Sequence, residues 1–155
     1  MDLIKLRLLI ETSTDDILVN EYRGNRISCL VDNDNDAFPD ERLTFADQSN
    51  KLSLPYGMAF YNNYFYVANR NDIRRYLYIN GSQNIQGKGE LLVDLDPNDY
   101  WTRSLLFLPK NRKMFIGIGS LTDHDNDPLP KASVQIANFD ETNQTTLLHL
   151  NFEIW

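Results

Sequence analysis

The residues best suited to chemistry in this chain form an acidic run between positions 32 and 40. Hard oxygen donors at alternate positions are the ligands that Ca²⁺ prefers, and four carboxylates fall on positions 1, 3, 5 and 9 of a calcium-loop spacing. These are Asp32, Asp34, Asp36 and Asp40. Two residues depart from the pattern, since Ala37 stands where glycine makes the sharp turn and Leu43 replaces the final bidentate carboxylate. The run therefore predicts either a calcium site or a solvated acidic turn, for which Asn and Asp are common.

Other reactive side chains give weaker signals. The sequence contains no Gly-rich phosphate loop, no Cys/His zinc spacing and no serine nucleophile elbow. Cys29 is the single cysteine, which excludes an internal disulfide, and we expect it to be a small buried hydrophobic residue. His124 lies in a second acidic cluster, and its type leaves open whether it acts as a base or is an exposed loop histidine.

A repeat of nearly fifty residues determines which elements position these groups. Segments that begin at Ile17, Phe65 and Phe115 share one local pattern and stand 48 and then 50 residues apart. Each period predicts four short strands rich in Ile, Val, Phe and Tyr. The predicted strands are Leu6–Ile10, Ile17–Val19, Arg26–Val31, Arg42–Ala46, Gly57–Phe60, Phe65–Val67, Asp72–Tyr78, Glu90–Leu95, Ser104–Phe107, Phe115–Gly117, Ala132–Phe139 and Thr145–Leu150.

Four strands in such a period are typical of one β-propeller blade. We therefore predict an all-β fold with three four-stranded blades, at about residues 1–47, 54–96 and 100–150, in a single partial propeller domain over 1–155. A parallel solenoid and a sandwich are the rival folds. Closed propellers usually have four to eight blades, so three blades predict a partial, open ring whose exposed edges favour self-association.

The composition of the chain limits the classes of molecule that it is expected to bind. A formal charge of −7 argues against nucleic acid and anionic membranes, which need basic patches. No apolar run is long enough to span a bilayer, and the start of the chain lacks the features of a signal peptide. The residues leave the compartment open.

Four motifs carry a resemblance to a known family. They are Leu54–Phe60, Tyr64–Asn69, Tyr100–Phe107 and Ile116–Ser120. In these motifs the chain resembles the glucose/sorbosone dehydrogenase family, whose fungal relatives are the pyranose dehydrogenases that depend on pyrroloquinoline quinone (PQQ). The resemblance runs from about Leu6 to Leu150. It implies a six-bladed propeller, of which this chain would hold about half.

The resemblance also implies an activity, namely oxidation of a sugar or aldehyde by hydride transfer to PQQ, with calcium holding the quinone. The family motif reads His-Trp-Thr-Arg where this chain has Tyr100 to Arg103. The replaced His is similar to the general base, and free Tyr titrates about 3.5 units above free His. Loss of such a base costs roughly 10²- to 10⁴-fold in rate. The alternative function is a non-catalytic propeller binding module, or a gene remnant without activity.

Strand order predicts where a ligand lies. In an up-and-down blade, the connections before the first strand and between the second and third strands open on one end. That end collects four segments, namely Tyr100 to Arg103, Arg23 to Asn25, Asn69 to Asn71 and the loop Leu121–Pro130, so we expect any ligand there. The resemblance makes Arg103 a partner for a PQQ carboxylate and Trp101 a stacking face. The alternatives are an Arg103 that ties a loop carbonyl and a Trp101 that fills the hub.

Overall fold

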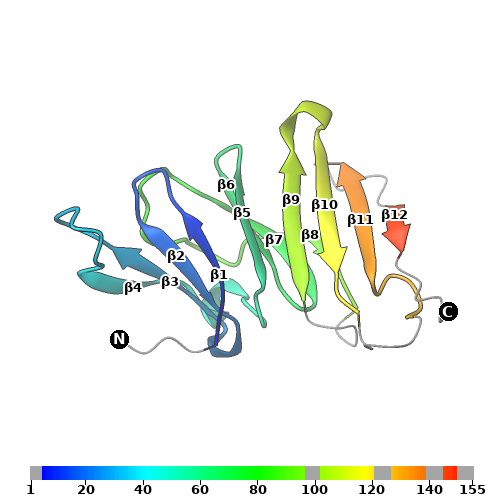
Figure 1. Ribbon diagram of the computed structural model, residues 1–155, viewed down its shortest axis with the longest axis horizontal. Helices are drawn as coiled ribbons and strands as arrows, with labels where there is room; N and C mark the ends of the chain where they lie inside the picture. Colours follow the sequence, from blue (N-terminus) through cyan, green and yellow to red (C-terminus); the bar gives the residue numbers. More distant parts are fainter. Residues whose placement is uncertain (1–4, 97–101, 121–126, 139–144, 150–155) are drawn as a thin grey trace.

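The computed structural model describes residues 5–96, 102–120, 127–138 and 145–149. Within these residues, twelve strands form three four-stranded antiparallel sheets that spread like a fan (Figure 1). We call these sheets blades 1, 2 and 3. Blade 1 contains β1 (Leu6–Glu11), β2 (Ile17–Glu21), β3 (Arg26–Val31) and β4 (Glu41–Ala46). Blade 2 contains β5 (Gly57–Tyr61), β6 (Tyr64–Ala68), β7 (Asp72–Leu77) and β8 (Glu90–Asp94). Blade 3 contains β9 (Arg103–Leu108), β10 (Lys113–Ile118), β11 (Ser133–Asn138) and β12 (Thr145–His149).

The predicted fold class is confirmed. Every strand pairs antiparallel with the next strand in the sequence, so each blade is an up-and-down meander. This pairing excludes the parallel solenoid, and three successive sheets replace the two facing layers of a sandwich. The described helices are 3-10 turns of three residues, at Tyr22–Gly24, Gln48–Asn50 and Pro109–Asn111. None of the described helices is long and apolar enough to cross a membrane.

The first apolar core lies between blades 1 and 2. Leu18 and Phe45 of blade 1 meet Phe65 of blade 2, and all three side chains are fully buried or nearly so. The rings of Phe45 and Phe65 contact edge to face, with centroids 5.0 Å apart. Burying one such side chain stabilises the fold by about 1.5–3 kcal/mol. Cys29 belongs to this core, as predicted, and burial raises the pKa of its thiol to about 12.

The second core lies between blades 2 and 3 and uses the opposite face of blade 2. Side chains alternate across a strand, so Phe65 points into the first core while its neighbour Tyr66 points into the second. Tyr66 contacts Phe107 of β9 at 4.5 Å between centroids, beside buried Met114 and Ile116. Blade 2 is therefore apolar on both faces, because it packs against a neighbour on each side.

A buried ion-pair cluster stabilises blade 1. The Glu21 carboxylate is fully buried and accepts hydrogen bonds from Arg42 at 2.6 Å, from Arg26 at 3.0 Å and from the Ser28 hydroxyl at 2.5 Å. A buried charge needs such partners because the protein interior solvates it poorly. The cluster ties together β2, β3 and β4, the three strands that supply its residues.

The innermost strands of blades 2 and 3 approach each other most closely at Gly57. A Cβ atom at this position would lie 2.5 Å from the Arg103 carbonyl oxygen and 3.1 Å from the Leu105 backbone nitrogen. Backbone atoms cannot swing away as the end of a flexible side chain can. Glycine at position 57 therefore lets β5 and β9 lie side by side.

Substituting this glycine should open the junction between blades 2 and 3. We expect Gly57→Ala to lower the free energy of unfolding by about 1–3 kcal/mol, the usual cost of overpacking a tight site. Urea denaturation followed by fluorescence measures the change. Gly87→Ala is the comparison, because its Cβ meets nothing within 4 Å and only its positive φ of 74° opposes alanine. A Gly57→Ala protein as stable as wild type would contradict the close approach.

Candidate functional site

Loops from all three blades gather at one end of the fan. Asn25, which follows the turn after β2, accepts a hydrogen bond from the Leu54 backbone at 2.6 Å. Asn69, which follows β6, accepts one from the Ser53 backbone at 3.0 Å. In blade 3 the Gly119 backbone donates to the Thr102 carbonyl at 3.2 Å. The connections that strand order assigned to one end therefore lie together, and we call this end the entry end.

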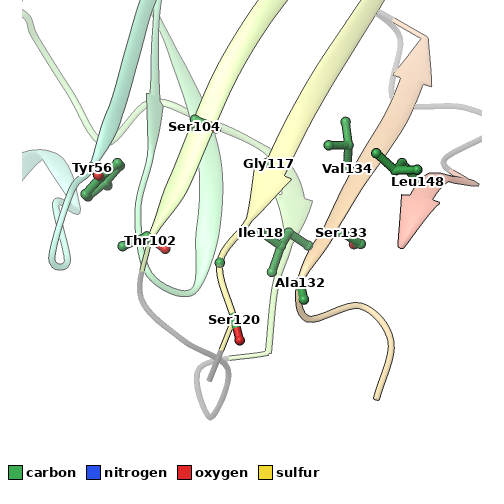
Figure 2. Close-up of a pocket in the computed structure, with 11 residues that line it drawn as sticks. Tyr56, Thr102, Ser104, Gly117, Ile118, Ser120, Ala132, Ser133, Val134 and Leu148 are labelled. Atoms are coloured by element: carbon green, nitrogen blue, oxygen red, sulfur yellow. The ribbon is translucent and has the colours of Figure 1, made fainter. Parts of the chain in front are cut away.

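A hollow of about 370 Å³ opens near the entry end of blade 3 (Figure 2). It lies against the face of blade 3 that points away from blade 2, which we call the outer face. Its walls are small, hydroxyl-bearing or apolar side chains. They belong to Tyr56, Thr102, Ser104, Gly117, Ile118, Gly119, Ser120, Ala132, Ser133, Val134 and Leu148. None of these lining residues carries a charge.

Gly117 keeps the floor of this hollow open. It lies opposite Ser104 in the pairing of β9 with β10, and a Cβ atom at position 117 would collide with the Ser104 hydroxyl. The sequence motif Ile116–Ser120 contains this glycine, but only the pairing shows which neighbour requires it. A side chain at position 117 would fill part of the hollow.

Arg103 lies on the other face of the same strand. Along β9 it alternates with Ser104, and it shares its face with Leu105 and Phe107, which pack against blade 2. Its side chain is fully buried, and its Nη1 donates to the Thr102 carbonyl oxygen at 3.0 Å. The structure thus places Arg103 at the entry end between two blades rather than in the hollow. The bond to Thr102 agrees with the alternative in which Arg103 ties a loop carbonyl.

Three other predicted positions, Tyr100, Trp101 and His124, lie outside the described residues. Their proposed roles stay predictions.

Asp127 is a residue that sequence reasoning missed. It belongs to the second acidic cluster, which the composition of the loop predicted to be solvated. Its side chain is instead only 4% exposed, and its carboxylate accepts a hydrogen bond of 2.6 Å from the Ser120 hydroxyl. Ser120 lines the hollow, so Asp127 supports the wall of the hollow from behind. The spacing of acidic residues alone contains no signal for this burial.

The acidic run follows β3 and lies at the end opposite the entry end. Asp32, Asp34 and Asp40 each offer a carboxylate oxygen within 4.8 Å of the others, which is close enough for one cation to bridge them. Asp36 is not part of this group, and its carboxylate accepts a 2.8 Å hydrogen bond from the Phe38 backbone. The structure therefore brings together three of the four predicted ligands.

The backbone of the run has the shape that the missing glycine would normally provide. Ala37 has φ of 69°, in the left-handed region that side chains other than glycine adopt at a cost of about 1–2 kcal/mol. The Asp32 carboxylate holds this turn by accepting a hydrogen bond of 2.8 Å from the Ala37 backbone. This geometry agrees with a calcium loop and equally with an Asx-type turn.

A calcium titration distinguishes these two interpretations. If the three carboxylates bind Ca²⁺ with a Kd of about 10⁻⁴ M, 10 mM calcium should stabilise the fold by about 2.7 kcal/mol. Thermal unfolding with and without calcium measures this shift. Asp34→Asn should abolish it, whereas Asp36→Asn is the matched control and should retain it. An unchanged melting temperature would identify the run as a solvated turn.

The cations of the entry end lie outside the hollow: Arg23 is in the turn after β2, where it donates to the Tyr22 hydroxyl, and Arg70 follows β6. The hollow itself has no cationic wall, and Arg103 is covered. The described residues therefore do not form a complete PQQ site by themselves. Arg103 has a planar fork that suits a carboxylate, but it is buried, so a cofactor contact through this residue needs the covering groups to move.

The chain resembles solved structures in fold. It matches the holo form of the PQQ domain of pyranose dehydrogenase from Coprinopsis cinerea with a TM-score of 0.72 and 14% identity, over 90% of this chain and 34% of that one. It matches the calcium structure of a Trichoderma reesei carbohydrate-active enzyme of family AA12 with a TM-score of 0.72 and 19% identity, over 91% and 37%. Virginiamycin B lyase from Staphylococcus aureus follows with a TM-score of 0.56 and 15% identity, over 94% and 41%.

Comparisons with protein families and with curated proteins found no match. The chain spans 34% to 41% of the length of these three structural relatives, and identities of 14% to 19% support the fold alone. The resemblance predicted from the sequence is therefore confirmed at the level of the fold: the three blades of this chain are similar in fold to part of the PQQ domain of pyranose dehydrogenase.

Proposed function

We propose that this chain is a divergent piece of a PQQ-dependent sugar or aldehyde dehydrogenase propeller. The observation that carries the proposal is the match of three successive blades to a holo PQQ domain over 90% of the chain. Six blades would form the complete ring, and this chain supplies half of them. The proposed small-molecule partner is a sugar or an aldehyde. Neither nucleic acid nor a membrane is part of the proposal.

The proposed roles follow the entry-end motif. Arg103 pairs with a cofactor carboxylate, and Trp101 presents a stacking face to the quinone or sugar. PQQ, when bound, accepts the hydride. Tyr100 takes the place of the usual His, and a phenol with a pKa near 10 is a poor base at neutral pH. Dehydrogenase activity by the usual route is therefore weak or absent.

A non-catalytic binding module is the second candidate function. The uncharged lining of the hollow and the covered Arg103 favour it, because a quinone bearing carboxylates needs exposed cations. A hollow with small, hydroxyl-bearing and apolar walls suits a neutral ligand better. Under this alternative, Tyr100 has no catalytic role.

PQQ titration separates the two candidates. For the first, we expect quenching of protein fluorescence by PQQ, and Arg103→Gln should weaken binding by about tenfold, the usual effect of losing a charge-assisted hydrogen bond. Arg112→Gln is the control, since it lies in the β9–β10 turn at the opposite end. Circular dichroism checks that Arg103→Gln folds. No quenching by PQQ would eliminate the dehydrogenase proposal.

Tyr100→His adds a gain-of-function arm to the same experiment. In PQQ and Ca²⁺ with an aldose, it should raise the rate of dye reduction by about 10²-fold if position 100 holds the base. An unchanged rate in a variant that still binds PQQ would place the missing base elsewhere.

Self-association through the open blade faces is a further part of the proposal. The outer face of blade 3 exposes Leu106 by 59%, Leu148 by 54% and Leu108 by 38%. A contiguous apolar sheet face of this kind is usually covered by another surface. We propose that an end blade of a second copy of the chain covers this face.

Light scattering after size exclusion tests this association. We expect the wild-type chain to elute as a dimer or larger species, whereas Leu106→Glu should shift it to the monomer because a charge on the outer face cannot be buried cheaply. Leu77→Glu is the control, because Leu77 of blade 2 is also exposed, by 66%. A monomeric wild-type chain at high concentration would contradict the proposal.

A further inference from the structure

We propose that a groove between blades 1 and 2 binds a neutral oligosaccharide, at the end of the fan opposite the entry end. The groove has a volume of about 640 Å³ and lies between the β1–β2 turn and the β5–β6 turn, whose strands appear side by side in Figure 1. Its volume falls within the usual range for small-ligand sites, about 300–1,000 Å³. This inference does not depend on PQQ or on Arg103.

Two aromatic rings provide an apolar surface in the groove. Phe60 and Tyr78 both line it, are partly buried, and pack with their ring centroids 4.6 Å apart. Phe45 supports Tyr78 from the core side at 6.2 Å. Rings held in this way are a rigid surface, and the apolar C–H face of a pyranose can stack on such a surface without ordering further side chains.

Amide side chains supply the polar contacts. Asn62, Asn63 and Asn80 line the groove and are exposed. Each amide offers two donors and an acceptor, which matches sugar hydroxyls that both donate and accept. Thr12 and Ser13 complete the opposite wall from blade 1.

The amides at the β5–β6 turn are preorganised. Asn62 and Asn63 have φ values of 48° and 62°, the two left-handed residues of a tight two-residue hairpin. The Asn63 carbonyl accepts a hydrogen bond of 2.9 Å from the Tyr78 backbone, which fixes the turn beside the aromatic surface. Little conformational entropy is then lost when a ligand binds to this wall.

Ser13 and Asn80 form a polar bridge between the two blades. The Ser13 hydroxyl donates to the Asn80 side-chain oxygen, and both residues are exposed. A ligand hydroxyl can replace either partner of such a bridge without leaving a buried group unsatisfied. The bridge therefore marks the place where a sugar hydroxyl would enter.

Charge determines the ligand class. Glu11 is the one charged residue among those that line the groove, and the whole chain carries −7. Phosphates, uronates and other anions would meet the Glu11 carboxylate and no cation among the lining residues. An aromatic surface with amides and hydroxyls around it therefore fits a neutral pyranose chain.

Titration with hexasaccharides tests the groove. Cellohexaose, xylohexaose and maltohexaose are added to the full chain, and binding is followed by calorimetry, with hexagalacturonate as the anionic comparison. We expect at least one neutral hexasaccharide to bind with a Kd below about 1 mM and hexagalacturonate to bind at least tenfold more weakly. Absence of neutral-sugar binding up to 10 mM, or equal binding of the anion, would overturn the inference.

Matched variants locate the site. Asn63→Gly keeps the positive φ and removes the amide, and Asn80→Ala removes the bridge to Ser13. Each should weaken binding about threefold to tenfold, as expected for one or two lost hydrogen bonds. Asn35→Gly is the control, an exposed asparagine with φ of 59° that does not line the groove. Binding that neither groove variant changes would also overturn the inference, whereas Arg103→Gln should leave saccharide binding unchanged.

Discussion

The backbone contact between β5 and β9 is the constraint on which the arrangement of blades 2 and 3 depends. A Cβ atom at Gly57 would lie 2.5 Å from the carbonyl oxygen of Arg103. Because these two innermost strands touch backbone to backbone, the outer strands of the two blades are free to diverge. The wedge between them is filled by large side chains such as Tyr66 and Phe107. The close backbone contact at Gly57 and the large side chains elsewhere between blades 2 and 3 together produce the fan.

The outer surfaces of the blades differ because only blade 2 has a neighbouring blade on each side. Blade 2 packs against a neighbour on each face, whereas blade 3 has one face covered by blade 2 and one that exposes Leu106 and Leu148. Blade 1 also lies at an end of the fan, but it buries the Glu21 carboxylate against Arg26 and Arg42. The outer face of blade 1 thus contains an ion-pair cluster, and the outer face of blade 3 is the one that we propose to associate with a second copy.

The two ends of the blades have separate functions in our proposals. The entry end holds the hollow and Arg103, and we relate it to the cofactor chemistry of the structural relatives. The opposite end holds the acidic run and the groove at Asn63 and Asn80, where turn residues supply exposed polar groups over an aromatic surface. Rigid blades hold the loops of each end in place, so either end can diverge without disturbing the other.

The sequence by itself determined the strands, because short-range alternation and turn residues are local properties: each predicted strand from Leu6–Ile10 to Thr145–Leu150 has a counterpart in the described blades. It also predicted the burial of Cys29 and a group of four carboxylates, of which the structure brings together Asp32, Asp34 and Asp40 and leaves out Asp36. Only the tertiary structure decided that Arg103 faces blade 2, that Asp127 is buried, and that Phe60 and Asn80 share a groove. Those outcomes depend on which blade faces pack together. Contacts between residues far apart in the chain cannot be predicted from the local spacing of residue types.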